Sequence, residues 1–143
     1  MSLRLGLVQI NVPDIAKARA FYVTQLGLPC RQPHGVEGPL EVDLGDDATL
    51  LLYAVDKVAP ATYETQRVTL VMFTDNLEQQ MAQWSSRGVE FQKVAWSTQP
   101  SGVGECPYGN FIAFQDPFGN VWELLEPTER RKPATVAGKR GKK

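Results

Sequence analysis

The sequence predicts an α+β fold in which two βαβββ modules form a curved, mixed β-sheet cleft with helices outside. Three observations support this: a strand–helix–strand pattern occurs twice, its two amphipathic helices align at an offset of about 62 residues, and 143 residues suit one domain or two fused modules. We expect modules at about residues 4–56 and 67–126, which together form a domain over 1–126.

The first module is predicted from a change of apolar period along the chain. Alternating apolar residues indicate strands, and apolar residues three or four apart indicate a helix. Asp14 is placed to cap the helix and Gly27 to end it. The expected elements are a helix over 15–26 and strands over 5–12, 28–31, 40–44 and 49–55, the last two joined by a turn at 45–47.

The second module repeats this order. The segment 74–76 contains capping residues, and a helix is expected to follow it and to end near Gly88. A polar, Gly- and Pro-rich loop over 97–110 is predicted, with a lid over a binding site as one role and a mobile surface loop as the alternative. The expected strands cover 68–73, 89–96 (one strand or two), 111–115 and 121–126, the last two joined by a turn at 116–120.

Charge is distributed unevenly along the chain. The net charge is −1, but residues 127–143 contain seven Lys or Arg and one acidic residue, which leaves the preceding body at −7. An acidic body argues against nucleic-acid binding, because phosphate contacts need a basic surface. We expect the basic tail to be disordered and solvated; weak contact with nucleic acid or a membrane surface is the alternative.

Nothing in the sequence indicates a membrane span or an export signal. No apolar run approaches the ~20 residues that cross a bilayer, and no signal-peptide pattern precedes the first strand. The two cysteines, Cys30 and Cys106, do not form a CxxC pair. These features predict a cytoplasmic protein that enters no membrane and binds no nucleic acid.

Three segments resemble a known family. They are the run from Val12 to Tyr22 with Leu26-Gly-Leu, the run Thr74-Asp-Asn-Leu with Arg87-Gly-Val-Glu-Phe, and the run Phe114-Gln-Asp-Pro-Phe-Gly-Asn-Val-Trp-Glu-Leu. In this order and spacing the chain resembles the vicinal oxygen chelate superfamily, which includes glyoxalase I, extradiol dioxygenases, and fosfomycin- and bleomycin-resistance proteins. The resemblance covers 5–126 and implies the fold and a homodimer, but no single activity.

The resemblance also implies where a catalytic metal would be bound. Metal-dependent members place His, Gln or Glu on four strands, and the matching positions here are Leu7, Leu51, Val68 and Glu123. A divalent ion needs several converging oxygen or nitrogen donors, which one carboxylate does not supply. The single histidine, His34, falls in a loop away from these strands. We therefore expect no metal and no other cofactor.

Strand parity predicts which side chains face the cleft, because successive residues of a strand point to opposite faces. Aromatic residues that flank the long loop are added because aromatic walls stack on planar ligands. Core packing, or exposure on an unused sheet face, is the alternative for each. The predicted ligand-binding residues are Leu7, Gln9, Asn11, Leu51, Tyr53, Val68, Leu70, Trp96, Tyr108 and Phe111.

Glu123 is the predicted catalytic residue. Partial burial in the cleft would raise the pKa of its carboxyl and suit it to act as a general base or to anchor a cation. The alternative is a carboxyl that only hydrogen-bonds Gln9, Tyr53 or a water molecule.

The predicted function is metal-independent binding of a small, partly aromatic or cationic compound in the cleft between the modules. The alternative is a lyase, isomerase or dioxygenase-like enzyme of the same superfamily that uses Glu123 as a base or as its sole retained metal ligand. The sequence leaves open whether the chain is an enzyme. A third reading is a structural or regulatory module whose pocket is filled by its own side chains.

Overall fold

A computed structural model describes residues 3, 5–59, 62 and 65–128. The first module comprises β1 (Val8–Val12), α1 (Ile15–Arg19), its π-helical continuation η1 (Ala20–Gln25), β2 (Cys30–Arg31), β3 (Leu40–Gly45) and β4 (Ala48–Ala54). The second comprises β5 (Leu70–Phe73), α2 (Leu77–Ser85), β6 (Phe91–Gln92), β7 (Gly104–Cys106), β8 (Gly109–Gln115) and β9 (Val121–Pro127).

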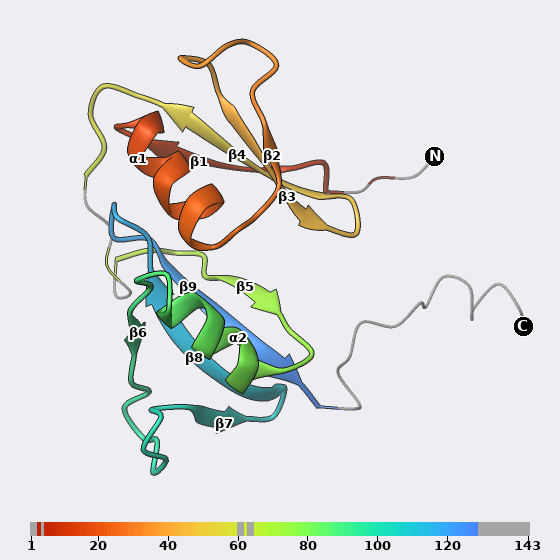
Figure 1. Cartoon of the computed structure of the whole chain (residues 1–143), viewed down its shortest axis with the longest axis vertical. Coiled ribbons are helices and arrows are strands. Elements are labelled where there is room, and N and C mark those ends of the chain that lie inside the picture. The colour runs from red at the N-terminus through yellow and green to blue at the C-terminus, as the bar shows by residue number, and fades with distance from the viewer. Residues whose placement is uncertain (1–2, 4, 60–61, 63–64, 129–143) are drawn as a thin grey trace, which may run out of the picture.

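Each module is a mixed sheet covered by one helical segment, which confirms the predicted α+β class (Figure 1). The first sheet has the strand order β1-β4-β3-β2, and the second has β5-β9-β8-β6 with β7 also paired to β8. In both sheets the strand that precedes the helix runs parallel to the last strand of its module, as β1 does to β4 and β5 to β9.

The structure corrects two boundaries of the second module. The segment predicted as a loop over 97–110 contains strand β7 and the beginning of β8, which pair as a hairpin around Gly109. β9 extends to Pro127, one residue beyond the expected end of the domain. The predicted disorder of the basic tail concerns residues that, from 129 onwards, lie outside the described part of the chain.

Both helices begin and end at the residues that the sequence indicated. The Asp14 carboxylate accepts a hydrogen bond from the Lys17 amide at 3.0 Å, and the Asn76 carboxamide oxygen accepts one from the Gln79 amide at 3.0 Å. Such N-caps satisfy amides that the helix leaves without a partner. After each helix Gly27 and Gly88 adopt φ of 75° and 91°, where a side chain would be strained.

One apolar core joins the two modules. It contains the helix-covered face of the first sheet, the helix-covered face of the second sheet, and the inner sides of both helices. Trp122 and Phe114 of the second sheet lie against Tyr22 and Phe21 of η1 at ring-centroid distances of 5.9 and 6.2 Å. The helical segment of the first module therefore packs on both sheets, which places the modules in one cooperative unit.

A buried polar network crosses this core. The Tyr22 hydroxyl donates to the Asp116 carboxylate at 2.7 Å and accepts from the Trp122 indole at 2.9 Å. Asp116 is 4% exposed and also accepts hydrogen bonds from the amides of Phe118 and Asn120, so its charge is well satisfied. Burial, reinforced by the negative charge of Asp116, raises the pKa of Tyr22 well above its usual value and keeps its hydroxyl a donor.

The ends of the two helical segments meet through a reciprocal contact. The Gln25 carboxamide donates to the Arg87 carbonyl at 3.0 Å, and the Arg87 guanidinium donates to the Gln25 carbonyl at 3.3 Å. The two residues are 62 positions apart, the offset at which the helices align in sequence. The Trp84 indole adds a hydrogen bond to the Leu26 carbonyl at 3.0 Å.

Candidate functional site

The face of the first sheet that the helix leaves uncovered is mainly polar. Val12, Leu50 and Leu52 are fully buried in the core, so their strand neighbours point to the opposite face. Register places Gln9 opposite Leu51 and Asn11 opposite Tyr53 on that face. All four are predicted binding residues, and the structure brings them together as strand parity indicated; their role in binding stays a prediction.

Two pairs of polar side chains on this face interact with each other. The Gln9 carboxamide donates to Asn11 at 2.9 Å. On the neighbouring strands β2 and β3, the Arg31 guanidinium and the Glu41 carboxylate form an ion pair at 2.6 Å. Tyr53 is 44% exposed. The first sheet thus offers a hydrated, hydrogen-bonding surface with one aromatic ring.

The uncovered face of the second sheet is mainly apolar. Val94, Phe111 and Leu125 form a second hydrophobic cluster with Cys106 at its border, separate from the main core. The Trp96 and Phe111 rings lie 5.9 Å apart, and Trp96 is 64% exposed. Phe111 and Trp96, both predicted binding residues, therefore form an aromatic surface on this sheet.

The side chains of β5 alternate as expected, but the prediction assigned the wrong set to the cleft, and the structure corrects one predicted residue. Leu70 pairs with Trp122 and packs against the main core, so it points away from the uncovered face. The side chains that β5 presents on that face are Val71 and Phe73, which are 42% and 53% exposed. The run Leu-Val-Met-Phe is apolar at every position, so the sequence contained no alternation from which to choose.

Glu123 lies in the middle of this apolar face. Register places it between Ala113 on β8 and Val71 on β5. Within the described residues, no donor forms a hydrogen bond or ion pair with its carboxylate. Burial raises the pKa of Glu123 above its ordinary value, because an apolar surrounding disfavours the charged form. The result is a partly buried carboxylate that can bind a proton or a cation.

The segment predicted as a mobile lid is held in a compact turn. The Ser97 hydroxyl donates to the Val103 carbonyl, and the Val94 and Gly102 amides bond to Gly102 and Gln99 carbonyls. Gly102 and Val103 are buried. These contacts attach the loop to the second sheet, with Val103 packed in the main core. A role for this segment as a lid stays a prediction.

Three predicted positions lie at the margins of the two faces. Leu7 precedes β1 and is 46% exposed, and Val68 precedes β5 and is 68% exposed. Tyr108 lies in the β7–β8 hairpin with 51% of its surface exposed, and its backbone carbonyl accepts from the Thr128 amide at 3.0 Å. None of the three lies on a paired strand of the site.

The donor set was tested for its fit to a metal ion. Glu123 faces Ala113 and Val71, and His34 is exposed in the loop between β2 and β3. In the part of the chain that the structure describes, no three His, Cys, Asp or Glu residues lie close enough to hold an ion together. The residues present do not fit a transition-metal site.

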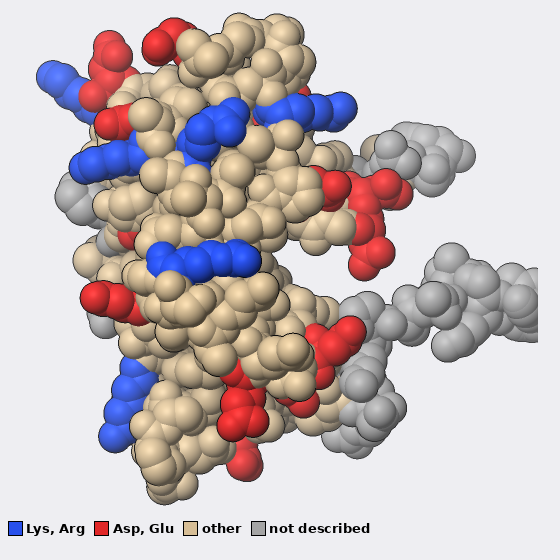
Figure 2. Space-filling view, in the orientation of Figure 1, with Lys and Arg blue, Asp and Glu red and all other residues tan. Residues whose placement is uncertain are grey.

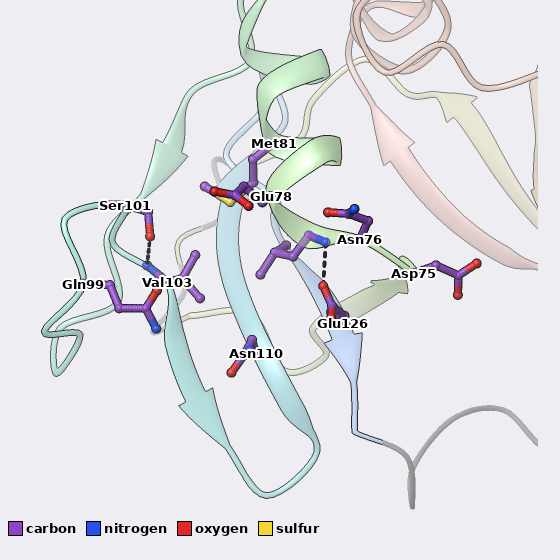
Figure 3. A pocket seen from close by; sticks show the side chains of 10 residues that line it. Asp75, Asn76, Glu78, Met81, Gln99, Ser101, Val103, Asn110 and Glu126 are labelled. Carbon is purple, nitrogen blue, oxygen red and sulfur yellow. Dashed lines mark hydrogen bonds between the residues drawn. The ribbon is translucent and has the colours of Figure 1, made fainter.

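A separate hollow of about 550 Å³ lies on the helix-covered side, at the beginning of α2 (Figure 3). Asp75, Glu78 and Glu126 contribute carboxylates to it, with carboxamides from Gln99 and Asn110. Glu126 accepts a hydrogen bond from the Leu77 amide at 2.7 Å and so caps the helix. None of the predicted binding residues lines this hollow.

On the face shown in Figure 2, Lys and Arg side chains are interspersed with acidic and uncharged surface. No helix among the described residues is long and apolar enough to cross a membrane.

The comparison with family models identifies the chain. The model of the Glyoxalase/Bleomycin resistance protein/Dioxygenase superfamily matches residues 4–124. The chain belongs to this superfamily. No curated protein matches it in sequence.

Solved structures of the superfamily share the fold. A glyoxalase/bleomycin resistance protein from Streptomyces sp. CB03234 is 32% identical, with a TM-score of 0.58 over 84% of this chain and 97% of that one. TnmS3, an antibiotic binding protein from the same organism, is 28% identical, with a TM-score of 0.64 over 89% and 98%. The fosfomycin resistance protein FosX from Listeria monocytogenes is 16% identical, with a TM-score of 0.65 over 93% and 100%, and shows the fold alone.

Proposed function

We propose that this superfamily member binds a small, partly aromatic or cationic organic compound on the uncovered faces of its two sheets. The observation that carries the proposal is Glu123, a partly buried carboxylate that lies inside an apolar face and that no described residue pairs. Ionised carboxylates are rarely buried unless a counter-charge is near. A bound cation would supply that counter-charge, and the aromatic surface beside it would accept a ring.

The same site supports binding without a metal. The positions that match the family's metal ligands include Leu7, Leu51 and Val68, which have no donor atoms. Metal content of the purified protein tests this part of the proposal. We expect no stoichiometric zinc, nickel or iron by elemental analysis, and one tightly held ion per chain would contradict metal-independent binding.

The antibiotic-binding relative supports the choice of ligand size. TnmS3 is an antibiotic binding protein, and the structural match covers 98% of its chain. By this likeness we infer a drug-sized organic ligand, which in proteins is held by mostly apolar surface with a few polar groups. A thermal-shift screen of aromatic and amine compounds, followed by NMR mapping of the responders, tests the proposal. Resonances of β5, β8 and β9 should shift; a broad screen without a responder would contradict it.

We also propose that the protein forms a homodimer. Val71, Phe73 and Trp96 are large apolar side chains exposed on one face of the second sheet, and such patches commonly mark an interface or a binding surface. A second copy placed over this face would complete the enclosure of a ligand. Light scattering coupled to gel filtration should give twice the chain mass, and a single-chain mass at micromolar concentration would contradict this proposal.

A second candidate function is metal-free isomerase or lyase chemistry with Glu123 as general base. The raised pKa favours it, because a base works best when its pKa approaches the working pH. Glu123→Gln keeps the side-chain shape and removes the base. For any substrate that the protein turns over, this variant should lose at least ~100-fold in kcat. Unchanged turnover would leave Glu123 as a binding group only.

A further inference from the structure

The strand register aligns four side chains in one row across the uncovered face of the second sheet. Ala113 of β8 pairs with Gln92 of β6 on one side and with Glu123 of β9 on the other, and Glu123 pairs with Val71 of β5. The adjacent residue Phe91 packs into the main core, so Gln92 points to the uncovered face. Gln92 and Glu123 are therefore the two polar members of this row, and Ala113 lies between them.

The side chain of Ala113 is smaller than those of its neighbours on the same face, so it leaves space that they would fill. The next row of the same face, two residues along β8, contains Phe111 opposite Leu125, and Leu125 opposite Phe73. Directly opposed side chains of a sheet have Cβ atoms about 5 Å apart, so each row is a nearly continuous surface. Ala113 contributes a single methyl group between Gln92 and Glu123, where the next row has the large side chains of Phe111 and Leu125. From this difference in size we infer a shallow recess between the carboxylate and the carboxamide.

We propose that this recess is the charge-recognition part of the binding face and selects ligands in which a protonated amine is joined to an aromatic ring by a short linker. The inference rests on the proposed function and names the ligand class for that same site. The ammonium group occupies the space above Ala113, where it donates to Glu123 and to the Gln92 carboxamide oxygen. The ring lies on Phe111 and Leu125.

The dimensions of the sheet fit such a ligand. Gln92 and Glu123 are separated by two strand spacings, about 10 Å, which leaves room for one ammonium group between their side chains. Successive residues on one face are about 7 Å apart along a strand, so a two- or three-atom linker spans from the recess to the Phe111 row. An anion would be repelled by Glu123, and a neutral polar group would leave its charge unpaired.

The test uses the full chain and three indole compounds that differ in one group: tryptamine, its alcohol analogue tryptophol, and indole-3-acetate. Dissociation constants are measured by NMR titration at pH 7. Tryptamine should bind about ten-fold more tightly than tryptophol, because hydrogen bonds to a charged group exceed neutral ones, and indole-3-acetate should bind weakest.

Two substitutions separate charge from space. Glu123→Gln should reduce the preference for tryptamine over tryptophol to about two-fold or less, because the charge is lost while the shape remains. Ala113→Leu should weaken tryptamine binding about ten-fold by filling the recess. Ala82→Leu adds the same side chain at an exposed position of α2 and should change nothing. If Ala113→Leu does not fold, Ala113→Val replaces it with a smaller expected loss.

The outcomes distinguish this inference from the function on which it rests. Equal binding of tryptamine and tryptophol, or an Ala113→Leu variant that binds like the parent, would overturn the recess as a charge-recognition site while leaving a binding protein. Absence of binding by all three compounds, together with no responder in the compound screen, would overturn both.

Discussion

The two sheets have one topology and opposite chemistry on their uncovered faces. The first presents paired polar groups, with Gln9 bonded to Asn11 and Arg31 bonded to Glu41. The second presents an apolar cluster around Phe111 and a carboxylate that no described residue pairs. The helix-covered faces of both sheets must be apolar because they form the core. The residues on the uncovered faces are free to differ between the two modules.

The difference also separates structural from functional polar groups. On the first face Gln9 pairs with Asn11 and Arg31 with Glu41. Glu123 has no such partner among the described residues, and an unpaired, partly buried charge in a native structure calls for a functional explanation. The second face is therefore the one on which we expect ligand chemistry to depend.

The largest expected effect concerns the buried hydrogen bond between Tyr22 and Asp116, which joins the two modules. Asp116→Ala should lower the free energy of unfolding by about 3 kcal/mol, because it leaves the buried Tyr22 hydroxyl and two half-buried amides without an acceptor. Asp75→Ala removes an exposed carboxylate and should stay within about 0.5 kcal/mol of the parent. Denaturant unfolding should remain a single transition. Separate transitions would show that the two modules unfold independently.

The next effect compares matched aromatic residues on the two uncovered faces. Phe111→Ala should cost about 2–3 kcal/mol of stability, because Phe111 is 8% exposed and anchors the second cluster. Tyr53→Ala on the first face should cost less than about 1 kcal/mol, since its ring is 44% exposed. Both values come from chemical denaturation, and equal losses would show that the two faces are packed alike.

A smaller effect compares matched carboxylates. Burial raises the pKa of Glu123, so folding favours its protonated form; this contribution is complete below the unfolded pKa and is lost as pH rises through the folded pKa. Glu123→Gln should therefore stabilise the ligand-free protein at pH 7, by less than about 1 kcal/mol given its partial exposure.

The control for that prediction lies on the first face. Glu41→Gln removes one partner of an exposed ion pair and should leave stability unchanged or lower it by at most about 1 kcal/mol. Melting curves at pH 4 and pH 7 measure both variants. The gain from Glu123→Gln should be present at pH 7 and absent at pH 4, and a gain that did not vary with pH would argue against an unpaired buried charge.

The smallest effect concerns the polar face alone. Gln9→Ala removes one exposed hydrogen bond to Asn11 and should change stability by no more than about 0.5 kcal/mol. Its value lies in ligand titration. A weaker affinity for the indole probes, with unchanged stability, would show that the polar face contributes to binding and would reduce the contrast between the two faces.

Most of the fold could be predicted because its signals are local. Capping by Asp14, helix ends at Gly27 and Gly88, and the alternation of β1 each depend on a few adjacent residues. β7 was missed because its residues are polar and Gly-rich, and it is held by pairing with β8. Such pairing is not visible in local periodicity.

The candidate site was predictable only where strands alternate. Gln9, Asn11 and Glu123 were placed on the uncovered faces by parity, because their neighbours are core residues. Leu70 was placed wrongly because its strand is apolar on both sides. Ala113 was missed for another reason. Its small side chain matters only because it lies between Gln92 and Glu123, which are on other strands, and only the strand register brings the three together.

The reciprocal contact between Gln25 and Arg87 has a consequence for how the chain came to be assembled. Each side chain donates to the other's backbone carbonyl, so the contact has the symmetry of two equal partners and makes no use of the peptide link between them. In a symmetric pair of half-length chains, the same hydrogen bond would form twice, once from each chain. The contact between these equivalent positions is therefore one that two half-length chains related by a two-fold axis could also form.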